Sequence, residues 1–181
     1  MVVTNHESTQ TTALDLLDDV IKRAKKAGAD AVDTVLFDSA SLSVSYRLGE
    51  RENVERSESN DLGLRVLIGQ GQGLVSSNDT SARALDELVN RAVAMAKAAT
   101  ADPYCGLAPE GRLSDEIPDL DLLDADEPSS ETLIAQAAEA ENSARAVSGI
   151  TNSEGAGADW SRTGIALATS HGFHGAYTTS R

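Results

Sequence analysis

The chain has 181 residues, of which 40% are hydrophobic and 3% aromatic, and its formal net charge at pH 7 is −14. That apolar content is enough for a folded core and excludes a wholly disordered chain, and the length suits one domain or one domain with the start of a second. The acidic charge is repelled by phosphate backbones and by anionic lipid surfaces, which argues against nucleic-acid and membrane binding.

The sequence also carries signs of its compartment. Cys105 is the one cysteine, so no internal disulfide can form, which fits a reducing cytosol. The stretch from Met1 to Thr12 is polar and has no apolar signal core. No apolar run approaches the roughly 20 residues needed to cross a bilayer. We therefore expect a cytoplasmic protein without a membrane span.

The chain begins with a polar stretch followed by a helical pattern. Residues 1–11 are expected to form a disordered tail. A helix is predicted from about Thr12 to Ala27, because apolar residues recur on one face and Gly28 can end it in the left-handed conformation. Basic residues crowd its last turns, where cations suit the helix dipole, and we interpret them as a solvated helix end.

Alternating apolar and polar residues between Ala31 and Asn78 predict an antiparallel β-meander. Residues 42–48 and 62–68 show the pattern most clearly, and turn residues separate these runs. We expect about five short strands in this stretch. The charged segment from Arg51 to Ser59 predicts a strand that lies at an edge or is wet on both faces.

The rest of the chain adds two helices and more strands. A helix is predicted from about Ser81 to Ala99, packed on the same sheet face as the first helix. Residues 101–128 hold all four prolines and most of the acidic excess, which is typical of a surface connection. A third helix with a weak apolar stripe is predicted from about Ser129 to Val147, and strand-rich segments follow it.

These elements predict an α+β fold, namely an antiparallel β-meander covered on one face by two helices, followed by a third helix and the start of a second strand-rich region. The expected divisions are a tail over 1–11, a sheet domain over 12–100, an acidic connection over 101–128 and an incomplete continuation over 129–181. The chain stops at Arg181 inside or just after a predicted strand, which suggests a truncated chain or a sheet completed by another segment.

The residues do not form a catalytic constellation. Of the three histidines, His171 and His174 have no cysteine or carboxylate within five residues, and His6 lies in the predicted tail. Nothing local supports a nucleophilic pair of Cys105 and His171. The glycine-rich residues 69–73 lack the Lys-Ser/Thr of a phosphate loop and are interpreted as a hairpin turn. We therefore assign no catalytic and no metal-binding residue.

Six short motifs follow one another along the chain, namely Asp61–Val66, Gly71–Gly73, Ser76–Asp79, Asp102–Leu107, Asn152–Ala156 and Ser170–Phe173. Together, in this order and spacing, they resemble the N-terminal region of the TldD/PmbA family. The Asp-Pro-Tyr-x-Gly-Leu element looks more like the PmbA (TldE) branch than the TldD branch.

The resemblance implies a cytosolic bacterial or archaeal protein considerably longer than this chain. In the family, TldD and TldE form a heterodimeric metallopeptidase associated with the maturation of peptide antibiotics and with an antitoxin linked to gyrase poisoning, hence the name modulator of DNA gyrase. The TldD subunit holds zinc with a His-Glu-x-x-x-His helix and a later cysteine. That motif does not occur in this sequence, so zinc is expected in a TldD-like partner and no cofactor in this chain.

The leading hypothesis is an N-terminal part of a PmbA/TldE-like protein, the non-zinc-binding partner of a TldD-type metallopeptidase acting in peptide maturation or proteolysis. Its expected partners are a TldD-like subunit or a second copy of itself, and an extended peptide substrate held by strand addition. Because functional residues favour loops, the candidates for peptide or partner contacts are Asn152, Ser153, Glu154, His171 and Phe173. Two alternatives stay open: a stand-alone protein-interaction module without a peptidase role, and a truncated catalytic zinc metallopeptidase subunit.

Overall fold

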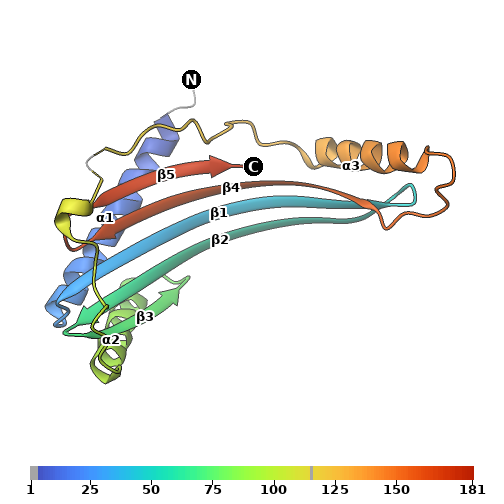
Figure 1. Ribbon diagram of the computed structural model, residues 1–181. Helices are drawn as coiled ribbons and strands as arrows, with labels where there is room; N and C mark the ends of the chain where they lie inside the picture. The colour runs from blue at the N-terminus through green and yellow to red at the C-terminus, as the bar shows by residue number, and fades with distance from the viewer. Residues whose placement is uncertain (1–3, 115) are drawn as a thin grey trace. The chain divides into compact units, whose positions relative to one another are not determined.

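The computed structural model describes residues 4–114 and 116–181. The elements follow in the order α1 (Thr4–Lys26), β1 (Ala31–Arg47), β2 (Glu50–Ile68), β3 (Gly71–Ser77), α2 (Ala82–Ala98), the 3-10 helix η1 (Glu110–Arg112), α3 (Ser130–Arg145), β4 (Ala156–Thr169) and β5 (His174–Ser180) (Figure 1). The strands form one five-stranded sheet in the order β3-β2-β1-β4-β5. The fold is therefore α+β, as the sequence predicts.

The chain divides into two compact units. Unit 1 contains the chain up to Asp38 together with residues 60–120 and 164–177, and unit 2 contains residues 39–59, 121–163 and 178–181. Strands β1, β2 and β4 contribute residues to both units. The two units are not continuous in sequence, because each of these strands runs from one unit into the other. The boundaries expected at residues 100 and 128 stay predictions.

In unit 1, helices α1 and α2 cover one face of the sheet (Figure 1). Alternate apolar residues of β2 point at these helices and are fully buried, while the residues between them are not part of this core. The core is a single cluster whose most buried members include Leu17, Val20, Ala24, Val32, Leu62, Leu64, Val66, Leu88 and Ala92. The prediction of two helices on one face of a half-apolar sheet is confirmed.

The backbone of strand β3 lies directly against the backbone of helix α2. A Cβ atom placed on Gly73 would lie 2.2 Å from the carbonyl oxygen of Ala92, and one on Gly71 would lie 2.2 Å from that of Ala96. The glycine-rich stretch therefore has two roles. Its first residue, Gly69, belongs to the turn between β2 and β3, whereas Gly71 and Gly73 lie in β3 and let the helix approach.

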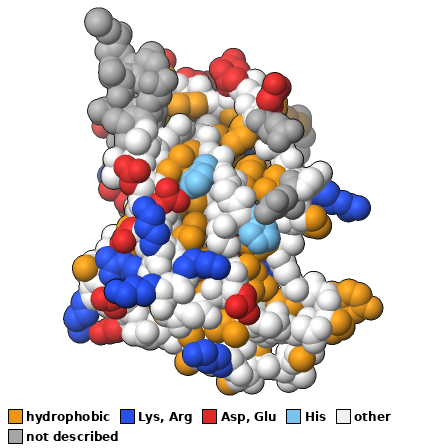
Figure 2. All heavy atoms as spheres, turned by 90° about the vertical axis from the view of Figure 1, so that its left-hand side faces the viewer, with side chains coloured by type: hydrophobic (Ala, Val, Ile, Leu, Met, Phe, Trp, Pro, Cys, Tyr) orange, Lys and Arg blue, Asp and Glu red, His pale blue; other side chains and the backbone are white. Residues whose placement is uncertain are grey.

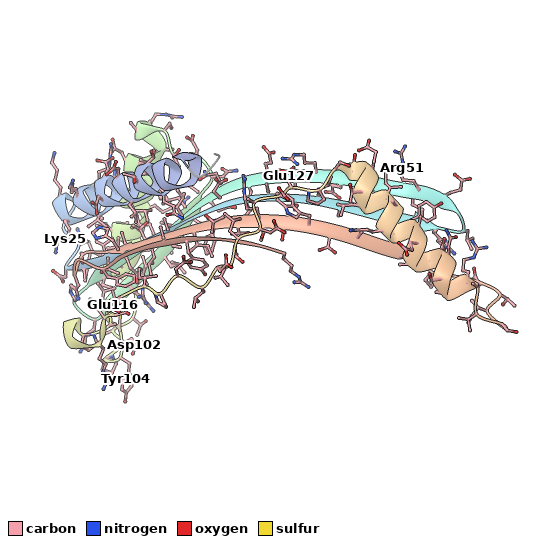
Figure 3. The ribbon with its side chains drawn as sticks, turned by 90° about the horizontal axis from the view of Figure 1, so that it is seen from above. Lys25, Arg51, Asp102, Tyr104, Glu116 and Glu127 are labelled. Atoms are coloured by element: carbon pink, nitrogen blue, oxygen red, sulfur yellow. The ribbon has the colours of Figure 1, made fainter. Side chains whose placement is uncertain are left out.

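Residues 101–114 and 116–120 cross the opposite face of the sheet in unit 1 (Figure 1). The backbone N–H of Asp102 donates to the carbonyl oxygen of Gln70 at 2.8 Å. Ile117 lies close to β5, since a Cβ atom placed on Gly175 would be 2.9 Å from the Cδ1 atom of Ile117. Figure 3 shows Asp102 on the side of the sheet away from α1 and α2. Most residues of this segment stay exposed, so the predicted surface connection also serves as a loose cover.

In unit 2, helix α3 packs on β1 and β4. Leu133 and Ala137 of the helix are 2% and 1% exposed, and they join alternate residues of β1 and the indole of Trp160 in a second cluster. Ser129 caps the helix by accepting a hydrogen bond from the Thr132 N–H at 3.1 Å. The weak apolar stripe is therefore enough, because the cap and two buried positions anchor the helix.

The start of the first predicted helix needs a correction. Helix α1 begins at Thr4 rather than Thr12, so residues 4–11 continue the helix instead of forming a tail, and residues 1–3 lie outside the described residues. No glycine or proline interrupts this stretch, so its polar sequence can extend a helix that the apolar face further on has nucleated. The tail prediction followed from polarity alone, which does not exclude helix.

The strands are longer and fewer than predicted within residues 31–78. Three strands, β1 to β3, occupy this stretch instead of about five, because Asn60 and Asp61 continue β2 rather than turning the chain. Strands β4 and β5 form the predicted second strand-rich region, and they pair beside β1 in the same sheet. Which strand lies next to which depends on contacts between distant residues, and periodicity carries no information about them.

Candidate functional site

The first predicted contact loop, residues 152–154, lies in unit 2 beside the turn between β1 and β2. The Nε atom of Arg47 donates to the carbonyl oxygen of Ser153 at 3.1 Å, and the Ser153 hydroxyl accepts from the Gly155 N–H at 2.9 Å. Asn152 and Glu154 are exposed. Ser153 therefore holds the loop in place, and its two neighbours are the side chains available to a partner.

A buried carboxylate secures the same end of unit 2. Glu141 of α3 is 1% exposed, and it accepts backbone hydrogen bonds from Leu48 at 2.7 Å and Gly49 at 3.1 Å. Both turn residues have positive φ angles, 52° and 88°. Because a positive φ is unfavourable for leucine, the turn depends on a carboxylate that receives both of its N–H groups.

Opposing influences set the ionisation of Glu141. Burial raises the pKa of this carboxyl. The opposing effect is larger: the pKa is lowered by hydrogen bonds from the Leu48 N–H, the Ser153 hydroxyl and the Gly49 N–H, and by the positive charge of Arg145. The net pKa therefore lies below its ordinary value. The sequence analysis missed this residue. The available signal is its spacing, since Glu141 follows Leu133 and Ala137 at four-residue intervals on the buried stripe.

The second predicted contact group, His171 and Phe173, lies in the turn between β4 and β5 in unit 1. This turn is tied to β1 because the Ser170 N–H donates to the Val32 carbonyl oxygen at 2.8 Å and the Val32 N–H donates to the Ser170 hydroxyl at 3.0 Å. His171 is exposed and Phe173 is half-buried. The turn is therefore fixed, and the imidazole of His171 stands free at its surface.

His174 contacts Asp18 of α1, with 2.8 Å between Nε2 and Oδ1, and Figure 2 shows two separate histidine side chains on this surface. Within the part of the chain that the structure describes, no group of three or more histidine, cysteine, aspartate or glutamate residues is arranged to hold a metal ion. The loop at residues 152–154 belongs to unit 2, so the five predicted residues do not form one cluster within either unit.

A polar groove of about 720 Å³ lies between α1 and α2 in unit 1, lined by Asp19, Lys22, Arg23, Lys26, Ala27, Asp86, Val89 and Asn90. Its central guanidinium, on Arg23, donates to Asp19 at 2.7 Å and to Asp86 at 2.6 Å. Arg23 therefore joins the two helices, while Lys22, Lys25 and Lys26 are the exposed part of the predicted basic helix end.

Among the described residues, no helix combines the length and the apolar character needed to span a membrane. An ion pair between Asp33 of β1 and Arg65 of β2 joins these neighbouring strands in unit 1, with 3.0 Å between Asp33 Oδ1 and Arg65 Nε. The polar contacts described above thus stabilise turns, helices and strand pairs.

Known proteins resemble this chain in sequence. Residues 32–96 match the family model for PmbA/TldA metallopeptidase domain 1. The metalloprotease PmbA homolog of Haemophilus influenzae is 37% identical over 163 residues, which cover 89% of this chain and 36% of the relative. Metalloprotease PmbA of Escherichia coli O157:H7 is 36% identical over 155 residues, which cover 84% of this chain and 34% of the relative. The chain thus spans about a third of the length of these curated relatives.

Solved structures share the fold. TldE from Thermococcus kodakarensis matches with a TM-score of 0.74 at 18% identity, covering 91% of this chain and 37% of the other. A candidate modulator of DNA gyrase from Bacteroides thetaiotaomicron matches with a TM-score of 0.79 at 19% identity, covering 92% and 38%. Together, the family-model match and the curated relatives show that this chain is similar to the N-terminal region of PmbA/TldD-family proteins.

Proposed function

We propose that this chain is the N-terminal part of a cytoplasmic PmbA/TldE-like protein and acts as the non-zinc-binding partner of a TldD-type metallopeptidase in peptide maturation or proteolysis. The observation that carries the proposal is the 37% identity to a protein named metalloprotease PmbA over 89% of this chain. The likeness to the TldE fold agrees with it. In this role the chain supplies rigid surfaces, and the zinc belongs to the TldD-like subunit.

The contacts within each unit support a scaffold role. Two charged groups in the units are already engaged: Glu141 holds a turn, and Arg65 holds Asp33 of the neighbouring strand. The loop side chains that remain accessible, Asn152, Glu154 and His171, sit on turns fixed by backbone hydrogen bonds. Fixed loops cost little conformational entropy on binding, which suits them to contact a partner subunit or an extended peptide.

The direct test is recovery of a complex. Co-expression of the tagged chain with a TldD-like subunit is expected to yield a stable complex by affinity capture followed by size-exclusion chromatography. The double variant Asn152→Ala with Glu154→Ala is expected to reduce recovery of the complex several-fold. Arg83→Ala, at an exposed position of α2, is the matched control and is expected to leave recovery unchanged. Repeated failure to recover a complex with the unmodified chain contradicts the partner role and favours a stand-alone interaction module.

Zinc content tests the assignment of the metal to the partner. The purified chain, dialysed and analysed by mass spectrometry of its metals, is expected to hold far less than one zinc per chain. Stoichiometric zinc that survives dialysis would overturn this part of the proposal. A His-Glu-x-x-x-His motif in the genomic sequence after Arg181 would favour the truncated catalytic subunit instead.

A further inference from the structure

Part of β2 has a strand partner on one side only. Its register with β3 runs from Ile68 back to Leu62 and stops there, while β1 adjoins β2 on the other side. Residues 50–59 belong to unit 2 and are all exposed. Along this stretch β2 is the outermost strand (Figure 3), and among the described residues no strand pairs with its free side.

The free edge carries a self-complementary charge pattern from Glu50 to Arg56. Reflected about Asn53, glutamate at position 50 meets arginine at position 56, and arginine at position 51 meets glutamate at position 55. Two copies paired antiparallel with Asn53 opposite Asn53 therefore place opposite charges directly across from each other, and the two-fold symmetry repeats each pair. Directly opposed cross-strand side chains share one face of the sheet and attract each other when their charges are opposite.

Other registers lose this match. Because directly opposed side chains share one face of the sheet, the two-fold axis can move only by whole residues. When it moves to Glu52, that glutamate faces its own copy and no acid faces a base. When it moves to Val54, Glu52 faces Arg56 but Glu50 faces Glu58. A parallel, in-register pairing sets every charge against itself. The pattern thus favours one antiparallel register and disfavours its neighbours, which is how a charged edge can accept one strand while it resists general aggregation.

The side chains involved are accessible. Arg51 and Glu55 enter no ion pair among the described residues, whereas Arg56 contacts Glu58 at 2.9 Å and also Glu127. Figure 3 shows Arg51 in this region of β2, pointing into solvent. The pair between positions 51 and 55 therefore forms without breaking an existing contact, and it is the one to test.

We propose that two copies of this chain pair through the Glu50–Arg56 edge of β2, as antiparallel strands about a two-fold axis at Asn53. Isologous two-fold contacts of this kind are the commonest form of self-association. Backbone hydrogen bonds along the edge supply affinity, and the charge pairs set the register. The proposal is independent of the peptidase role, because it requires neither a TldD-like subunit nor zinc.

Sedimentation equilibrium on the full 181-residue chain tests the proposal. The chain is expected to show a monomer–dimer equilibrium that weakens as salt screens the charge pairs. Arg51→Glu sets an acid opposite Glu55 of the second copy, and Glu55→Arg sets a base opposite Arg51. Each variant alone is expected to lose at least about tenfold in dimer affinity, since two attractive pairs become repulsive.

An equimolar mixture of the two variants is the decisive sample. In the mixed dimer every acid again faces a base, so dimer affinity is expected to return, which a folding defect cannot explain. Arg83→Glu on α2, an exposed change of the same charge, is expected to leave the equilibrium unchanged. A wild-type chain that stays monomeric at all concentrations, as it would if this edge takes a strand from another protein, overturns the proposal. So do single variants that still dimerise, or a mixture that does not recover.

Discussion

At the scale of single residues, the turn between β1 and β2 shows how an unfavourable conformation is maintained. Leu48 and Gly49 both have positive φ angles, a combination for which Asn-Gly is the usual sequence in a two-residue hairpin. Glu141 compensates by accepting both backbone N–H groups. Since an N–H buried without an acceptor is costly, this carboxylate links α3 to the hairpin more firmly than its exposed neighbours on the helix.

Glu141→Gln is expected to lower the melting temperature at neutral pH, because an amide replaces one of the two acceptor oxygens with a donor that faces an N–H. The pKa of Glu141 is lower in the folded chain than in the unfolded chain. Its stabilising effect is therefore complete above the pKa of an unfolded glutamate and is lost as the pH falls through the folded pKa. Thermal melts should show the gap between variant and wild type closing on acidification.

Glu139→Gln, an exposed change on the same helix, is the control and is expected to melt with the wild type at neutral pH. A gap between Glu141→Gln and wild type that stays constant down to acidic pH would show that the carboxylate charge is not what holds the turn.

At the scale of elements, the contact between α2 and β3 depends on the absence of side chains. Gly71 and Gly73 place the strand backbone directly beneath the helix carbonyls of Ala96 and Ala92. The helix itself is strongly amphipathic and capped by Ser81, so its position rather than its formation is what the glycines decide. Close backbone approach of this kind is a common reason for glycine inside a strand.

Gly73→Ala is expected to reduce the free energy of unfolding by about 1–3 kcal/mol, since the added methyl forces the helix away from the strand. The new Cβ would lie 2.2 Å from the Ala92 carbonyl oxygen and 2.9 Å from the Ala96 nitrogen. Urea denaturation measures the change. Gly106→Ala, where a Cβ meets nothing within 4 Å, should leave stability nearly unchanged. Equal midpoints for the two variants would contradict the close-approach argument.

At the scale of the whole molecule, two cores share the same strands but no buried residue. The first cluster unites α1 and α2 with the sheet of unit 1, and the second unites α3 with β1 and β4 of unit 2. A packing defect in one core need not affect the other core, because one cooperative unit can open at a lower free energy than unfolding of the whole chain requires.

Leu133→Ala is expected to destabilise unit 2 by about 2–5 kcal/mol, as removal of a buried leucine usually does. Hydrogen exchange should accelerate in α3 and in the adjoining part of β1, and much less in α1 and α2. Val147→Ala is the control, because Val147 is 59% exposed and its truncation leaves no cavity. Equal acceleration in both units would show that the two cores open together.

The sequence by itself determined the features that repeat locally. Helical periodicity located α2 and α3 to within a residue or two, and alternation identified which side chains of β2 face the core. The motifs were also enough to indicate the family. These features depend on residues a few positions apart, which a single sequence displays directly.

Only the tertiary structure decided how distant segments meet. Strands β4 and β5 extend the first sheet beside β1, Glu141 reaches back to Leu48, and the two predicted contact loops fall in different units. A strand pattern states which face is buried but not which neighbour it pairs with, because pairing is settled by contacts between residues far apart in the chain. For the same reason the free edge of β2 became visible only when the end of its register with β3 was known.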